Sequence, residues 1–168
     1  MKRSFLPLIT LLAFFATSCQ QGPGLEKEKE AIVAVLHEES AAIAALDFDR
    51  YKATHLQDEI QTRVELGVYG YRIYHGWEEV GGLVEDFMEG NDLHEAVNRK
   101  ENVQIKVNGN SAWLTCDNIW SGVSGEPGVE QNNLQIMFLE KVKGQWKISL
   151  VTFYTKPITG DGSLETFY

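Results

Sequence analysis

The apolar positions along the chain change their period near its middle. Between residues 25 and 46, apolar side chains recur at helical spacing among charged residues and alanines, which predicts a long amphipathic helix. An aspartate at 47 or 49 can cap a second, shorter helix. Residues 62–75 mix glycines with Val, Tyr and Ile, which favours irregular extended structure, and Gly76 opens a third helix. A further helical turn is expected within 92–99.

After residue 101 apolar residues alternate with polar ones, which is the period of a half-buried strand. Asn108-Gly109 is a strong hairpin signal, and Lys143-Gly144 predicts a tight turn. Strands are expected at about 111–121, 131–142 and 146–155. Helices followed by an antiparallel sheet indicate an α+β fold in which the helices cover one face of the sheet.

This order of elements resembles the NTF2-like (SnoaL-like) superfamily over residues 28–156. The segments that carry the resemblance are AALDFDRYKATHLQDE, YHGWEEVGGLVEDFM and the hairpin pair GNSAWLTCDNIW…LQIMFLEKVKGQWKISLVTFY. The resemblance implies a cone in which about three helices close a curved sheet around a pocket. It implies no single activity, because the superfamily holds isomerases, dehydratases, cyclases and many non-enzymes.

The two faces of the sheet can be assigned if Trp120 pairs with Asn132 and Lys143-Gly144 is a two-residue turn. The concave side is then expected to carry Leu114, Cys116, Asn118, Trp120, Leu134, Ile136, Phe138, Val151 and Phe153. The outer side is expected to carry Trp113, Thr115, Asp117, Gln135, Met137, Leu139, Ile148 and Leu150. A bulge at Gly144 would reverse the last strand.

So apolar an outer face is unusual for a monomer and predicts a homodimer. The residues expected to form the contact are Trp113, Met137, Leu139, Ile148 and Leu150, and back-to-back sheet packing is also what the resemblance implies. The alternative is that the C-terminal tail, residues 157–168, folds over this face with Phe167 and Tyr168.

The N-terminus resembles a bacterial lipoprotein signal. A basic start, an apolar run over 5–15 and small residues at 16–18 lead into Cys19, although Ala16 stands where leucine is usual. Residues 1–18 are thus expected to be a signal peptide, and 19–27 a lipidated cysteine with a short linker. The protein would be exported and anchored by its lipid in the bacterial cell envelope. A plain secretory signal with a chance cysteine is the alternative.

Charge narrows the choice of partners. The net charge is −9, and removal of residues 1–18 would take away two further cations. So acidic a surface argues against nucleic acid and against lying flat on anionic lipid. If Cys19 is acylated, Cys116 has no partner for a disulfide, and a buried core thiol is favoured over a reactive one.

No metal or cofactor motif is evident. The four histidines, His37, His55, His75 and His94, lack metal-ligand spacing, and no phosphate-binding loop or nucleophile motif occurs. The steroid isomerase branch of the superfamily needs a carboxylate base with a tyrosine and a protonated acid as oxyanion donors. Alignment on Asp47 and Gly76 places Leu66 (beside Glu65), Glu39 and Ile136 at these positions, so that activity is not implied.

Other residues are candidates for a pocket. Tyr51 and His55 can share a helix face, and with Asp58 they are candidate catalytic residues, although a core tyrosine beneath a surface histidine is the alternative. Candidate ligand-binding residues are Tyr51, His55, Tyr69, Tyr71, Trp77, Asn118, Trp120 and Phe153, of which the aromatic residues at 69, 71 and 77 suit an ordinary core equally well.

Two functions remain open. The first is a non-catalytic module that holds a small apolar ligand or a partner segment. The second is a pocket enzyme that performs acid–base chemistry, as an isomerase or dehydratase does, on a small organic substrate. The polar groups of the cavity separate them, because a base and an acid within hydrogen-bond reach favour the enzyme.

Overall fold

A computed structural model describes residues 23–67, 70–93, 96–122 and 130–155. Three helices occur in this part of the chain: α1 (Pro23–Ala44), α2 (Phe48–Thr54) and α3 (Gly76–Gly90). The described strands are β1 (Thr62–Gly67), β2 (Gly70–His75), β3 (Val97–Asn108), β4 (Ser111–Ser121), β5 (Glu130–Val142) and β6 (Gln145–Thr155). They form one sheet in the order β2-β1-β6-β5-β4-β3, in which only the β1–β6 pair is parallel. The predicted α+β class is confirmed.

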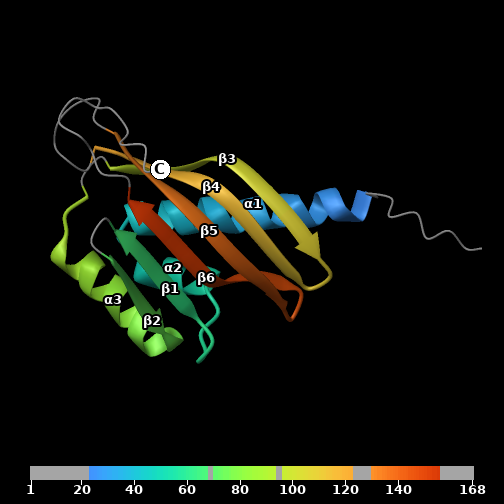
Figure 1. The fold of residues 1–168 in the computed structure, drawn as a ribbon, viewed down its shortest axis with the longest axis horizontal. Coiled ribbons are helices and arrows are strands. Elements are labelled where there is room, and N and C mark those ends of the chain that lie inside the picture. Colours follow the sequence, from blue (N-terminus) through green and yellow to red (C-terminus); the bar gives the residue numbers. More distant parts are fainter. Residues whose placement is uncertain (1–22, 68–69, 94–95, 123–129, 156–168) are drawn as a thin grey trace, which may run out of the picture.

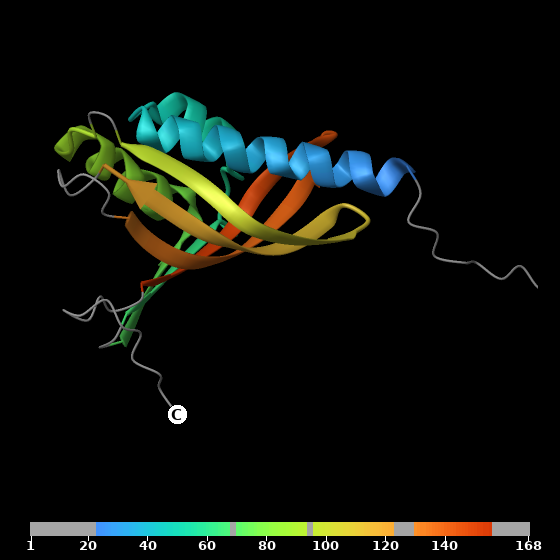
Figure 2. The same ribbon diagram turned by 90° about the horizontal axis from the view of Figure 1, so that it is seen from above.

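The helices lie on one side of a curved sheet. α1 runs along the concave face of the long strands, while α2 and α3 lie at the end where β1 and β2 sit (Figures 1 and 2). Ile32 and Leu36 of α1 pack against a buried sheet core formed by Ala112, Leu114, Cys116, Met137, Leu139, Trp146, Ile148 and Val151. None of the described elements covers the opposite, outer face of the sheet (Figure 2).

Local signals in the sequence account for most element boundaries. The Asp47 carboxylate accepts a hydrogen bond from the Arg50 N–H at 3.1 Å and caps α2, as predicted. Lys143 and Gly144 both have positive φ, 50° and 82°, which is the conformation of a two-residue hairpin turn. The predicted helical turn in 92–99 is wrong, because β3 already begins at Val97; residues 94–95 lie outside the described part of the chain.

Residues 62–75, expected to be irregular, form a regular hairpin of β1 and β2. The residues that separate the two strands, 68–69, lie outside the described part of the chain. This hairpin joins the main sheet through the parallel pairing of β1 with β6.

The inward face predicted for β4 is confirmed, but the face predicted for β5 is wrong. Trp120 pairs with Gln131 instead of Asn132, a slip of one residue that turns every side chain of β5 to the other face. Consequently the inner face of β5 holds Gln135, Met137 and Leu139, and its outer face holds Leu134, Ile136 and Phe138. Apart from Gln135, both alternating sets of LQIMFL are apolar, so the pattern constrains the register only weakly.

The C-terminal part of β6 faces the predicted way because two errors in the prediction cancel, the slip of one residue in β5 and an unpredicted bulge between β5 and β6. A bulge where Phe138 pairs with Leu150 and Leu139 with Ile148 leaves Ser149 unpaired between them. This irregularity restores Val151 to the inner core despite the slip in β5, and Phe153 packs against that core. It also turns Ile148 inward, contrary to the prediction.

The outer face is apolar, but with different residues from those predicted. Met137, Leu139 and Ile148 are fully buried on the helix side, whereas Leu150 is half-buried. The exposed apolar side chains on the outer face of β4 and β5 are Trp113 (46% exposed), Leu134 (39%), Ile136 (37%) and Phe138 (47%). These four residues, with Leu150, are called the outer patch below.

Cys116 is a buried core residue, as predicted, although it pairs across the strands with Gln135 and not with Ile136. Burial raises the pKa of its thiol to about 11. Among the described helices, none is both long and apolar enough to cross a membrane.

Candidate functional site

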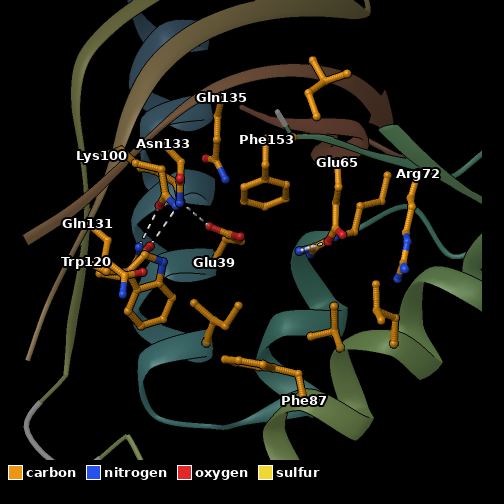
Figure 3. Close-up of a pocket in the computed structure, with 18 of the residues that line it drawn as sticks. Glu39, Glu65, Arg72, Phe87, Lys100, Trp120, Gln131, Asn133, Gln135 and Phe153 are labelled. Carbon is orange, nitrogen blue, oxygen red and sulfur yellow. Dashed lines mark hydrogen bonds and ion pairs between the residues drawn. The ribbon is translucent and has the colours of Figure 1, made fainter. Parts of the chain in front are cut away.

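A cavity of about 770 Å³ lies where the concave face of the sheet meets α1 and α3 (Figure 3). This volume is typical of sites for small organic molecules. Its apolar walls come from helices and strands alike: Ile43, Leu66, Leu83, Val84, Phe87, Leu93, Trp120 and Phe153. Much of its remaining lining is polar or charged. The buried polar side chains of this lining are called the floor below: Glu39, Asn98, Lys100, Asn118 and Gln135.

The floor centres on an ion pair between Glu39 of α1 and Lys100 of β3. The Lys100 ammonium nitrogen lies 3.0 Å from Glu39 Oε2, and the two side chains are only 2% and 4% exposed. Glu39 faces the sheet because it lies one helical turn beyond Leu36, on the buried side of α1. Lys100 faces it because Lys100 pairs with Asn118, whose neighbours on the inner face are core residues. Removing both charges from water is costly, so this pairing requires explanation.

Two asparagines complete the environment of the ammonium. Lys100 Nζ donates to Asn118 Oδ1 at 2.7 Å and to Asn98 Oδ1 at 3.2 Å. Asn98 Nδ2 in turn donates to Asn118 Oδ1 at 2.7 Å, and both asparagines are buried. Three oxygens therefore lie within 3.2 Å of the ammonium group, which fixes its position and balances its charge.

Two buried atoms of the floor lack directed hydrogen bonds. Glu39 Oε2 is in ionic contact with Lys100 but accepts no well-aligned hydrogen bond from a described residue. Gln135 is fully buried; its Oε1 accepts a weak bond from Cys116 Sγ at 3.9 Å, while its Nε2 has no described partner. Figure 3 shows the Gln135 side chain pointing from β5 toward Glu39. Buried polar atoms are normally bonded, so this donor and this acceptor distinguish the floor from an ordinary core.

The mouth of the cavity is charged and more open. Arg63 and Glu65 of β1 form an ion pair at 2.9 Å, and the Arg63 guanidinium lies 4.3 Å from the centre of the Phe153 ring. Arg72 of β2 is the cross-strand neighbour of Glu65 and also lines the cavity. Arg72 forms no ion pair with another described residue, and it lies at the exposed rim.

The predicted ligand-binding residues divide into two groups. Tyr71, Asn118, Trp120 and Phe153 line the cavity. Tyr51, His55 and Trp77 instead lie in a second buried cluster, in which Tyr51 packs with Ala42, Val84 and Met88, and the His55 ring stacks on Tyr51 and lies tilted toward Trp77. Tyr69 lies outside the described residues.

The second cluster is closely packed. The His55 ring stacks on Tyr51 with centroids 4.2 Å apart, and its Nδ1 lies 2.9 Å from Thr54 Oγ1 and 3.1 Å from the Tyr51 carbonyl oxygen. A Cβ at Gly81 would lie 2.8 Å from the Trp77 ring, so this glycine allows the indole to lie against α3. Trp77 therefore packs against its own helix and is not among the residues that line the cavity.

The candidate catalytic residues are not gathered at the cavity. Burial lowers the pKa of His55 to about 4 and, with a smaller contribution from the Glu39 charge, raises the pKa of Tyr51 above its usual value. His55 is thus neutral near pH 7. Asp58 is exposed, and its carboxylate accepts a bond from the Ile60 N–H at 3.0 Å. None of these three residues lines the cavity.

Sequence reasoning missed most of the floor: Glu39, Asn98, Lys100 and Gln135. Glu39 could have been found, because a carboxylate between Leu36 and Ile43 interrupts the apolar stripe of a predicted helix. Lys100 lay before the expected start of its strand, and Gln135 was assigned to the wrong face. The described residues contain no group of three or more His, Cys, Asp or Glu side chains placed to hold a metal ion.

Comparison with known proteins agrees with this architecture. Residues 32–151 match the SnoaL-like domain family. An NTF2-like superfamily protein from Salmonella enterica serovar Typhimurium shares 17% identity, with a TM-score of 0.66 over 85% of this chain and 99% of that one. A protein of unknown function with a cystatin-like fold from Nostoc punctiforme shares 17% identity, with a TM-score of 0.64 over 80% and 95% of the two chains. No curated protein is similar enough in sequence to be matched.

A third solved structure, a candidate dehydratase of the NTF2-like family from Streptomyces avermitilis, shares 15% identity with this chain. Its TM-score is 0.63, over 78% of this chain and 97% of that one. At such identities the likeness concerns the fold alone.

Proposed function

This protein belongs to the SnoaL-like domain family, and we propose that its domain binds one small organic molecule in the cavity above Glu39 and Lys100. The binding is non-covalent and needs no cofactor. The walls supply apolar contact, and the floor supplies the polar groups that orient the molecule.

The observation that carries this proposal is the buried polar floor. A fold that needed only a core would be at least as stable with apolar side chains in place of the Glu39–Lys100 pair, because desolvation offsets most of the attraction within a buried ion pair. The floor also contains three buried amides, from Asn98, Asn118 and Gln135. Polar groups gathered in this way around an open cavity are the usual composition of a recognition site.

A second candidate function is acid–base catalysis, and the same pair favours it. Glu39 carries a carboxylate oxygen without a directed hydrogen bond, next to a cation that would stabilise developing negative charge. Such a pair could take a proton from a carbon of the bound molecule and return it elsewhere, as in isomerisation or elimination. If so, Glu39→Gln should abolish turnover while leaving binding within a few-fold.

Native mass spectrometry of the protein purified from its own host tests both functions. We expect a retained small-molecule adduct on the wild-type protein and none on the Glu39→Leu/Lys100→Met double variant, which has a similar volume but an apolar floor. Release of the adduct and its incubation with fresh protein then separates the candidates: an unchanged compound supports binding, and a converted compound supports catalysis. Equal adduct on both proteins would refute the assignment of the site.

We also propose that the domain is tethered to the envelope through a lipid on Cys19, a residue outside the described part of the chain. The support is the sequence pattern that precedes this cysteine. Growth with an alkyne fatty acid should label the wild-type protein but not Cys19→Ala. Equal labelling of the two would refute the anchor.

Finally, we propose that the outer patch packs against a second copy of the chain. An uncovered sheet face with Trp113, Leu134, Ile136 and Phe138 exposed together is unusual for a protein that remains monomeric. The contact differs from the one expected from the sequence, since the face of β5 is reversed.

A further inference from the structure

The floor of the cavity has an unusual balance of hydrogen-bonding groups. It offers one buried acceptor without a directed bond, Glu39 Oε2, and one buried donor without a partner, Gln135 Nε2, while its only cation, Lys100, is already surrounded by three oxygens. We propose that the ligand enters with a neutral head group that carries one donor and one acceptor, such as a hydroxyl or a carboxamide. This inference rests on the proposed binding function and names the ligand class.

An anionic head group does not fit this floor. A carboxylate could accept a bond from Gln135, but it would lie beside the Glu39 carboxylate, whose charge already balances that of Lys100. Like charges at such short range repel strongly where water is excluded. Arg72, which forms no ion pair within the described part of the chain, lies at the exposed mouth on β2, where an ion pair with a ligand contributes little.

A cationic head group fits no better. The charge of Glu39 is already balanced by Lys100 at 3.0 Å, so a second cation would meet the ammonium group at close range. It would also leave the Gln135 donor without an acceptor. A neutral group that donates to Glu39 and accepts from Gln135 satisfies both atoms and adds no charge.

The apolar walls of the cavity indicate the chemistry of the rest of the ligand, beyond its head group. Phe153 and Trp120 rise from the sheet and Phe87 from α3, so an aromatic or other flat apolar body can lie between them while the head group reaches the floor (Figure 3). Such a ligand is a small aromatic or alicyclic alcohol or amide.

A set of probes that differ in the head group tests the inference: benzyl alcohol, benzamide, benzoate, benzylamine and ethylbenzene. The full-length wild-type protein in detergent is labelled with ¹⁵N-tryptophan, and the indole signal of Trp120 is followed, with free probe concentrations fixed by equilibrium dialysis. We expect benzyl alcohol and benzamide to bind at least about tenfold more tightly than benzoate and benzylamine.

Variants of Gln135 add a second criterion. Gln135→Leu should remove the advantage of the neutral polar probes over ethylbenzene, and Gln135→Glu should shift the preference to the cationic benzylamine. Gln131→Leu is the matched control, because Gln131 lines the cavity on the same strand but is exposed. It should leave the ranking unchanged. If a Gln135 variant does not fold, the wild-type ranking alone decides.

The outcomes separate the two proposals. If no probe shifts the Trp120 signal, both the binding function and the head-group inference are overturned. If the probes bind without preference, or benzoate or benzylamine binds best to the wild type, the binding function stands and the head-group inference is refuted.

Discussion

Replacing Glu39 and Lys100 singly and together measures what the buried ion pair contributes. Lys100→Met leaves the Glu39 carboxylate buried without its counter-charge, and Glu39→Leu leaves the Lys100 ammonium with amide oxygens alone. Removing one member of such a pair should lower the free energy of unfolding by about 3–5 kcal/mol. Because both side chains are almost fully buried, solvent screening does not reduce this figure much.

The double variant should behave differently. With both charges gone, the floor becomes an apolar surface of similar volume, and the free energy of unfolding should equal that of the wild type or exceed it by about 1–4 kcal/mol. The single effects are thus strongly non-additive, as expected for residues in contact. Urea unfolding at 25 °C gives the four free energies, and an unchanged dependence on urea concentration verifies that the same transition is compared.

An exposed pair of the same chemistry provides the control. Lys29 and Glu26 lie 2.9 Å apart on the surface of α1, and their coupling in the matching Lys29→Met/Glu26→Leu cycle should be only about 0.3–0.5 kcal/mol. Additive effects at Glu39 and Lys100, or a double variant less stable than either single one, would contradict the reasoning. The pair would then stabilise the fold outright, and the argument that it serves a ligand would lose its basis.

Three further outcomes follow from the structure. Burial holds the pKa of His55 near 4, below its value of about 6.5 in an unfolded chain, so stability should fall as the pH is lowered from 6.5 to 4, by about 3 kcal/mol. His55→Gln should remove this component of the pH dependence, whereas the same change at the exposed His37 should not. In a Cys19→Ala variant, Cys116, with its pKa raised to about 11, should resist a thiol reagent at pH 8 until denaturant is added, and prompt labelling of this native variant would contradict its burial. Sedimentation should find a dimer that Phe138→Lys converts to a monomer. If the full chain is instead monomeric and deletion of 157–168 makes it self-associate, the tail, and not a second copy, covers the outer patch.

The fold could be predicted from the sequence because its determinants are local. The helical spacing that ends before Asp47, the cap at Asp47 and the turn at Lys143-Gly144 each depend on residues close together in the chain. Each signal can therefore be recognised without knowledge of the tertiary structure. Together these signals define the order of elements that characterises the family.

The floor of the cavity could not be predicted in the same way, because its contacts join distant parts of the chain. The meeting of Glu39 with Lys100 depends on how α1 lies across β3, and the facing of Gln135 depends on a strand register. Neither short-range periodicity nor residue type determines these arrangements. Four of the eight predicted ligand-binding residues were found at the cavity: Asn118 and Trp120 from the correct facing of β4, Phe153 because two errors cancelled, and Tyr71 although a regular β2 was not expected.

The error in β5 and the location of the site have a common cause. In the alternation of this strand, Gln135 shares a face with Met137 and Leu139, and the opposite face carries Leu134, Ile136 and Phe138. Hydrophobic patterning assigns the set containing glutamine to the outside, since a buried amide is costly without partners. The structure places that glutamine inside, in the wall of the cavity, and leaves its amide nitrogen without a described partner. Positions where the pattern fails in this way are expected at functional sites, so the misassigned Gln135 supports the proposed location of the ligand.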